Sequence, residues 1–275
     1  MNQGHGMAHF YSAQNSYTFP YVIEGVAFDN DNSLYQEPDN ARAVRRQGAV
    51  EAIQNQFPDM GDAEARKIMD YSKQKYGGSL EAFVTEHGAD ISMLRDDHYD
   101  YLIAHTSAQN GFFDMARTPQ RQLEMLDQSG VKLAIATHGN RPWVHHTLIQ
   151  NQLNEYFSDE TVVTKDDAGG AGKNVSTAIY DLALDVLGAP ETEYEAERGI
   201  GYAMVEDEME NLRLAKARGM ATILINNGRY QPEEIADYVD VIVNDNKDAT
   251  RLILESNSAQ SNYDHDSIAP DTTPD

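Results

Sequence analysis

The sequence contains no cysteine among its 275 residues. This absence excludes disulfide bonds, thiolate zinc sites and cysteine nucleophiles. No apolar run approaches the roughly 18 residues of a membrane-spanning helix, and the first twenty residues lack a basic start followed by an apolar stretch. We therefore expect a cytoplasmic protein that has no membrane partner.

Basic residues are also scarce, with 21 Lys and Arg against 45 Asp and Glu and a formal net charge of -24. Tight binding of nucleic acid depends on neutralising phosphates with Lys and Arg, so we expect no nucleic acid polymer as a partner. A small anionic substrate is still compatible with this negative charge, because surface charge is screened over about 8 Å at physiological salt. The hydrophobic content of 40% is ordinary for a globular protein.

Composition divides the chain into a core, an insertion and two ends. Residues 1–19 and 256–275 are polar and aperiodic, which predicts a disordered N-terminal tail and a disordered acidic C-terminal tail. Residues 38–114 show helical periodicity interrupted by Gly, Pro and Ser, with no convincing strand. We interpret them as an all-helical domain inserted into a core that comprises residues 20–37 and 115–255.

The core alternates apolar strand patterns with amphipathic helix patterns, which predicts an α/β fold with a doubly wound parallel sheet. In such folds ligands bind at the carboxyl ends of the strands. The expected strands are YVIEGVAF at 21–28, VKLAIAT at 131–137, TVV at 161–163, GYAMVE at 201–206, ATILIN at 221–226 and VDVIV at 239–243; the expected helices span 118–129, 142–156, 174–187 and 208–218, and a short acidic helix precedes the last strand.

Acidic pairs follow two of these strands. Asp29 and Asp31 come directly after the first strand, where carboxylates could ligate a hard cation or act as nucleophile and proton donor. An Asx-rich turn explains the same letters equally well. Glu206 and Asp207 close another strand, and an acid pair at a helix start is common because the helix dipole favours it. If the sheet is parallel, the two pairs face one another.

Two further polar sets fall at the same edge. Thr137, His138 and Gly139 offer a hydroxyl and free amides ahead of a helix, which suits an anion, although an ordinary helix cap explains them alone. Lys173 lies in GGAGKN, where an ammonium could hold a phosphoryl group. The alternative for that segment is a Gly-rich turn with an exposed lysine. Together the four sets predict a phosphate site.

In order and spacing, the four sets resemble the motifs of the haloacid dehalogenase superfamily of phosphatases. FDNDNSLY, LAIATHGN, GAGKNVSTAIYDLAL and MVEDEMENLRLAKARGM resemble its first to fourth motifs, and the resemblance covers about residues 21–245. It implies a Rossmann-like core, and for residues 38–114 a small helical cap domain of the family's first class.

A narrower resemblance concerns the substrate. The segment YGGSLEAFVTEHGADISMLRDDHYDYL and the letters FDNDNSLY are similar to those of pyrimidine 5'-nucleotidases, which implies a nucleoside monophosphate such as UMP or CMP as the small phosphorylated partner. Neighbouring subfamilies with similar caps act on sugar phosphates or phosphoglycolate, so these substrates stay open.

The superfamily resemblance also implies roles for the residues. Asp29 would attack phosphorus and form an aspartyl phosphate, and Asp31 would protonate the leaving hydroxyl and then activate water. Thr137 and Lys173 would hold the phosphoryl group, with His138 and Gly139 beside it. The implied cofactor is Mg²⁺, bound by the Asp29 carboxylate, the Asp31 backbone carbonyl and Asp207, with Glu206 acting directly or through water.

The sequence departs from the family pattern at a few positions. Ser33 replaces the usual Thr, His138 the usual Asn, and Asn174 with Val175 the usual Lys-Pro pair. Asp31 disfavours a true dehalogenase, which does not need that acid. A phosphomutase and a catalytically idle ligand-binding protein remain alternatives, and no pattern indicates an oligomeric state.

Overall fold

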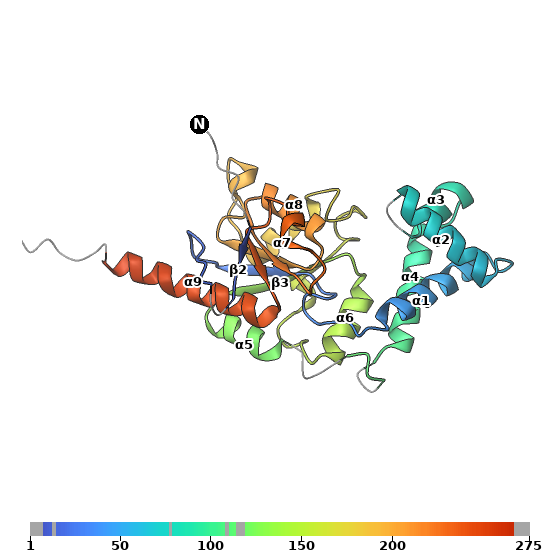
Figure 1. Ribbon diagram of the computed structural model, residues 1–275, viewed down its shortest axis with the longest axis horizontal. Coiled ribbons are helices and arrows are strands. Elements are labelled where there is room, and N and C mark those ends of the chain that lie inside the picture. Colours follow the sequence, from blue (N-terminus) through green and yellow to red (C-terminus); the bar gives the residue numbers. More distant parts are fainter. Residues whose placement is uncertain (1–7, 13–14, 77–78, 108–109, 114–118, 267–275) are drawn as a thin grey trace, which may run out of the picture. The chain divides into compact units, whose positions relative to one another are not determined.

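The computed structural model describes residues 8–12, 15–76, 79–107, 110–113 and 119–266 (Figure 1). The chain separates into two compact units. The first consists of Met1–Tyr35, Thr118–His138 and Gln152–Asp275, and the second of Gln36–Arg117 and Gly139–Asn151. Each unit has its own cluster of buried apolar side chains.

The first unit is built on a parallel sheet whose described strands follow the order β1-β7-β6-β5-β2-β3-β4. The central strands are buried on both faces, which explains why their sequences, GVAF, YAMVE and ATILI, are largely apolar. This confirms the predicted α/β doubly wound fold. The strands are β1 (His9–Phe10), β2 (Gly25–Phe28), β3 (Lys132–Thr137), β4 (Val162–Thr164), β5 (Tyr202–Glu206), β6 (Ala221–Ile225) and β7 (Val241–Val243).

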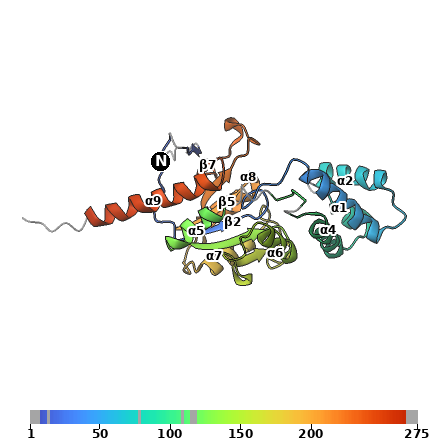
Figure 2. The same ribbon diagram turned by 90° about the horizontal axis from the view of Figure 1, so that it is seen from below.

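Helices cover both faces of this sheet. Helices α7 (Ala178–Leu187) and α8 (Met209–Ala217) lie on one face, and α5 (Gln120–Gln128) and α9 (Asn246–Asp266) on the other (Figure 2). Buried residues of α7, such as Ile179 and Ala183, recur at helical spacing and pack against the alanines of β3. Each large apolar side chain buried in this way contributes about 1.5–3 kcal/mol.

Some element boundaries differ from the expected ones. Strand β2 begins at Gly25, because the residues before it turn toward α9, where Asn257 binds the backbone of Ile23. Helix α7 begins at Ala178 rather than near 174, because the preceding residues form a turn in which Val175 donates its N–H to the carbonyl oxygen of Gly172. The short acidic helix is a 3-10 turn, Pro232–Glu234.

Both chain ends are ordered further than the composition predicts. In the first end, β1 pairs with β7, and Tyr11 and Phe19 are buried. In the second, α9 continues past residue 256, Ser256 is buried, and Gln260 donates to the carbonyl oxygen of Phe19. The prediction of two disordered tails is wrong for these residues, because polar side chains there bond to backbone groups. Residues 1–7 and 267–275 lie outside the described residues.

The second unit is helical throughout its described residues. Its helices are α1 (Ala41–Gln56), α2 (Asp62–Tyr76), α3 (Glu81–His87), α4 (Ile91–His105) and α6 (Arg141–Gln150). Residues 139–151, expected in the core, belong instead to this unit. The reason is Trp143 of α6, which is fully buried and stacks on Tyr99 of α4, while Asn140 donates to Asp96.

Within the described residues no helix is both long and apolar enough to cross a lipid bilayer. Helix α9 has the length, with 21 residues, but its sequence is largely polar.

The contact between α9 and the segment before β2 can be tested at Asn257. Its side chain accepts from the Ile23 N–H at 2.7 Å and donates to the Ile23 carbonyl oxygen at 2.8 Å. We expect Asn257→Ala to lower the free energy of unfolding by about 1–3 kcal/mol, because both backbone groups lose their partner. Urea denaturation measures this. Ser258→Ala, which removes only an exposed bond inside α9, is the matched control; equal stability of the two variants would contradict the contact.

Candidate active site

The carboxyl ends of three central strands meet at Asp29. Phe28, the last residue of β2, pairs with Ile135 of β3 on one side and Val205 of β5 on the other. Asp29 follows, and its N–H donates to the carbonyl oxygen of Val205 at 2.9 Å. The chain runs from β2 to β3 and β4 on one side before it returns to β5 on the other. This reversal is the switch point at which doubly wound folds bind ligands.

Lys173 joins these strand ends. Its ammonium donates to Asp29 Oδ1 at 2.6 Å, to the carbonyl oxygen of Ala136 at 3.2 Å, and to Glu206 Oε2. These three acceptors match the three protons of an ammonium group. The residue is 1% exposed, so the alternative of a surface lysine in a Gly-rich turn does not describe this structure.

Three carboxylates lie close enough to share a cation. Oxygens of Asp29, Glu206 and Asp207 are all within 4.8 Å of one another. Glu206 is fully buried, and its second oxygen accepts from the N–H groups of Asp207 and Glu208 at 3.2 and 3.1 Å. An oxygen-only set of this kind suits a hard divalent ion such as Mg²⁺ or Ca²⁺.

Crowding of negative charge is visible in the pKa values. Burial raises the pKa of Asp29 to about 7, with Glu206 adding to the rise and Lys173 opposing it. Burial, Glu206 and Asp29 raise the pKa of Asp207 to about 9. Burial lowers the pKa of Lys173, but the charges of Asp29 and Glu206 outweigh it and the pKa ends above its usual value. Lys173 therefore stays charged.

The other predicted residues take different places. Asp31 is half-buried, and its carboxylate accepts from the Tyr35 hydroxyl and, at 3.2 Å, from the Asn30 amide. Its side chain is not part of the three-carboxylate group. Thr137 is buried at the end of β3 beside Thr164 of β4.

The last two predicted residues, His138 and Gly139, belong to different units. His138 Nε2 accepts from the backbone N–H of Lys173 at 2.7 Å. Gly139, the next residue in the chain, belongs to the second unit.

Three groups around the site were not predicted from the sequence. Tyr35 binds Asp31, and its position four residues later was the available signal. The backbone carbonyl of Ala136 carries no mark in the sequence. Arg229 lies 3.8 Å from Asp207 and pairs with Glu208, and its loop offers no motif.

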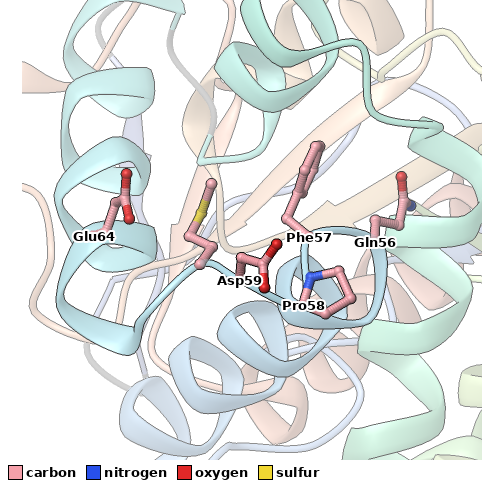
Figure 3. Close-up of a pocket in the computed structure, with 6 residues that line it drawn as sticks. Gln56, Phe57, Pro58, Asp59 and Glu64 are labelled. Atoms are coloured by element: carbon pink, nitrogen blue, oxygen red, sulfur yellow. The ribbon is translucent and has the colours of Figure 1, made fainter.

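A separate hollow lies on the second unit (Figure 3). Its lining comes from the end of α1, the connecting loop and the first turn of α2. The apolar part is formed by Phe57, Pro58 and Met60, and the two acids, Asp59 and Glu64, are exposed. No buried charge is among these residues, so the hollow lacks the features of a catalytic site.

The three-carboxylate group should bind a divalent cation in competition with protons. Because the cation needs ionised oxygens, its affinity should fall as the pH falls through about 9 and then about 7, the pKa values of Asp207 and Asp29. Calorimetric titration with Mg²⁺ in buffers of different ionisation enthalpy measures both the affinity and the released protons. Glu208→Gln should keep this dependence, whereas a pH-independent affinity without proton release would contradict it.

Comparison with known proteins gives one family and one curated relative. The profile of the haloacid dehalogenase-like hydrolases matches residues 26–225. Over 243 residues the chain is 24% identical to the glyceraldehyde 3-phosphate phosphatase of Methanocaldococcus jannaschii, covering 81% of this chain and 93% of that protein.

Solved structures agree on the fold. CbbY from Rhodobacter sphaeroides in complex with phosphate is 19% identical, with a TM-score of 0.56. The match covers 82% of this chain and 95% of that chain. A mutant of CbbY in complex with xylulose-(1,5)bisphosphate is 20% identical, with a TM-score of 0.55 and the same coverage. The family profile spans most of the chain, from β2 through β6, and the protein therefore belongs to the haloacid dehalogenase-like hydrolases.

Proposed function

We propose that this protein is a Mg²⁺-dependent phosphatase that hydrolyses a small phosphorylated metabolite through an aspartyl phosphate at Asp29. The observation that carries the proposal is the cluster of buried Asp29, Lys173 and Glu206 with half-buried Asp207 at the switch point of the sheet. Folding alone gives no reason to bury two carboxylates on one ammonium with a third carboxylate beside them, because each buried charge costs several kcal/mol unless it is compensated.

The first half of the reaction transfers the phosphoryl group. An oxygen of the Asp29 carboxylate attacks phosphorus, the bond from phosphorus to the substrate oxygen breaks, and the departing oxygen takes a proton from Asp31. The Tyr35 hydroxyl that donates to the Asp31 carboxylate fixes the orientation of this side chain. Lys173, which already contacts Asp29, lies where it can neutralise charge on the transferring group.

The second half releases Asp29. Asp31, now ionised, takes a proton from water, the water oxygen attacks phosphorus, and the bond to the Asp29 oxygen breaks to give inorganic phosphate. In this scheme Thr137 offers its hydroxyl to the phosphoryl oxygens from the end of β3.

The need for a cation follows from the charges at the site. The site holds three carboxylates that lie close together, two of which contact the one ammonium, so with all three ionised an approaching phosphate dianion would meet a negative surplus. Asp29 and Asp207, with Glu206 directly or through water, are the residues that would hold Mg²⁺. The Asp31 backbone carbonyl would complete the set. When bound, the ion neutralises nucleophile and phosphate and so lets two anions meet.

The curated relative supports a sugar phosphate as the substrate class, because its name gives glyceraldehyde 3-phosphate as its substrate. A pyrimidine nucleoside monophosphate is the second candidate, and it rests on the sequence resemblance of residues 28–35 and 76–102.

Phosphate release from a substrate panel tests the proposal. The panel holds glyceraldehyde 3-phosphate, ribose 5-phosphate, phosphoglycolate, UMP and CMP, each with and without Mg²⁺. We expect Mg²⁺-dependent release with the highest kcat/KM for a sugar phosphate, and a loss of at least about a thousandfold in Asp29→Asn, which lacks the nucleophile.

Asp166→Asn, at an exposed position in the same unit, is the matched control and should retain activity. Release confined to UMP and CMP would keep the mechanism and replace the substrate class. Absence of release from every member, or equal rates in Asp29→Asn and the parent protein, would overturn the proposal.

Substitution of Asp207 tests the cation ligands. Asp207→Asn keeps the size of the side chain but removes a negative charge from the three-carboxylate group. We expect the Mg²⁺ concentration for half-maximal activity to rise at least about tenfold. Glu210→Gln changes an exposed acid in the first turn of α8 and should leave that concentration unchanged. An unchanged value in Asp207→Asn would remove Asp207 from the site.

A further inference from the structure

His138 contacts the loop that carries Lys173. The two residues are 35 positions apart, and Nε2 of the imidazole accepts from the backbone N–H of Lys173 at 2.7 Å. A ring nitrogen that accepts has no proton of its own, so the ring donates only through Nδ1 in this arrangement. The side chain that follows β3 therefore holds the loop that precedes α7.

The same loop fits closely around the imidazole. A Cβ atom at Gly172 would lie 3.3 Å from His138 Nε2 and 3.1 Å from Asn174 Oδ1. Both distances are shorter than ordinary van der Waals contact, so a larger residue at 172 would force the imidazole or the loop to move. The absence of a side chain at Gly172 is what lets the ring reach the Lys173 N–H.

Other bonds among the described residues also hold this loop. Val175 and Ser176 donate their N–H groups to the carbonyl oxygen of Gly172 at 2.9 and 3.0 Å, and Arg213 donates to the carbonyl oxygen of Asn174 at 3.0 Å. None of the residues 172–176 is proline, so no ring restricts the backbone φ angle here. His138 and Arg213 thus each add a side-chain bond from outside the loop to the backbone of residues 173–174.

We propose that His138 is a positioning residue that acts through Lys173. Its imidazole anchors the Lys173 backbone at one end, while Asp29 and Glu206 bind the ammonium at the other. With both ends held, the ammonium stays at the place where the phosphoryl group arrives. This role rests on the proposed phosphatase function. It predicts a loss in kcat rather than in KM, because a displaced Lys173 no longer matches the charge of the transition state.

Two substitutions at 138 separate positioning from packing. His138→Phe keeps a ring and removes the acceptor. His138→Gln keeps an acceptor, because its side-chain oxygen is as many bonds from Cα as Nε2 is, whereas the shorter Asn does not reach. We expect His138→Phe to lower kcat by about ten- to a hundredfold with little change in KM, and His138→Gln to restore most of it. Gly172→Ala should lower kcat by a smaller factor, because the imidazole or the Asn174 side chain would have to shift by only a few tenths of an ångström.

Amide hydrogen exchange supplies a readout that needs no substrate. In His138→Phe the Lys173 amide should exchange about five- to tenfold faster than in the parent protein, the change expected when one hydrogen bond is lost. His138→Gln should keep the parent rate, and melting temperatures of the variants show whether they fold.

The two measurements also distinguish this role from the phosphatase proposal. If the parent protein hydrolyses no panel member, the phosphatase proposal fails, and the exchange of the Lys173 amide still decides whether His138 holds the loop. Parent-like exchange in His138→Phe would overturn the positioning role. An equal loss of kcat in His138→Gln and His138→Phe would overturn it as well.

Discussion

The burial of the Lys173 ammonium is the constraint on which the site depends. A buried ammonium is stable only when its protons are bound and its charge is compensated. Here the acceptors come from the ends of three adjacent strands: Asp29 after β2, Ala136 in β3 and Glu206 in β5. The strand order of the sheet therefore brings the three acceptors together around the ammonium. Removal of one acceptor would leave a buried charge that costs about 3–5 kcal/mol.

The same cluster contains more acidic than basic groups. Burial and mutual repulsion raise the pKa values of Asp29 and Asp207, so these two carboxyls hold protons that a cation can displace. In the proposed phosphatase this one arrangement would account for three properties: affinity for a divalent ion, tolerance of a phosphate dianion in a strongly acidic protein, and a carboxylate nucleophile close to an ammonium. Chemistry of this kind needs no basic surface, which agrees with the net charge of -24.

Much of the fold could be predicted from the sequence because the central strands are continuous apolar runs and the helices between them have clear periodicity. The strand ends then indicated which polar residues meet, and Asp29, Lys173 and Glu206 do meet. The chain ends could not be predicted, because Ser256, Asn257 and Gln260 act through bonds to backbone groups rather than through an apolar pattern. For the same reason the sequence could not predict the bond from the Lys173 N–H to the His138 imidazole. A motif shows which residues are present but not which backbone group a side chain binds.

The central claim is that Asp29 becomes covalently phosphorylated. The most direct measurement is to mix the protein with Mg²⁺ and the member of the substrate panel from which it releases phosphate fastest, quench within one turnover, reduce with borohydride, and map the peptides by mass spectrometry. Borohydride converts an aspartyl phosphate to homoserine. The account predicts substrate-dependent homoserine at position 29. Turnover with an unmodified Asp29, or with the modification at another carboxylate, would contradict it.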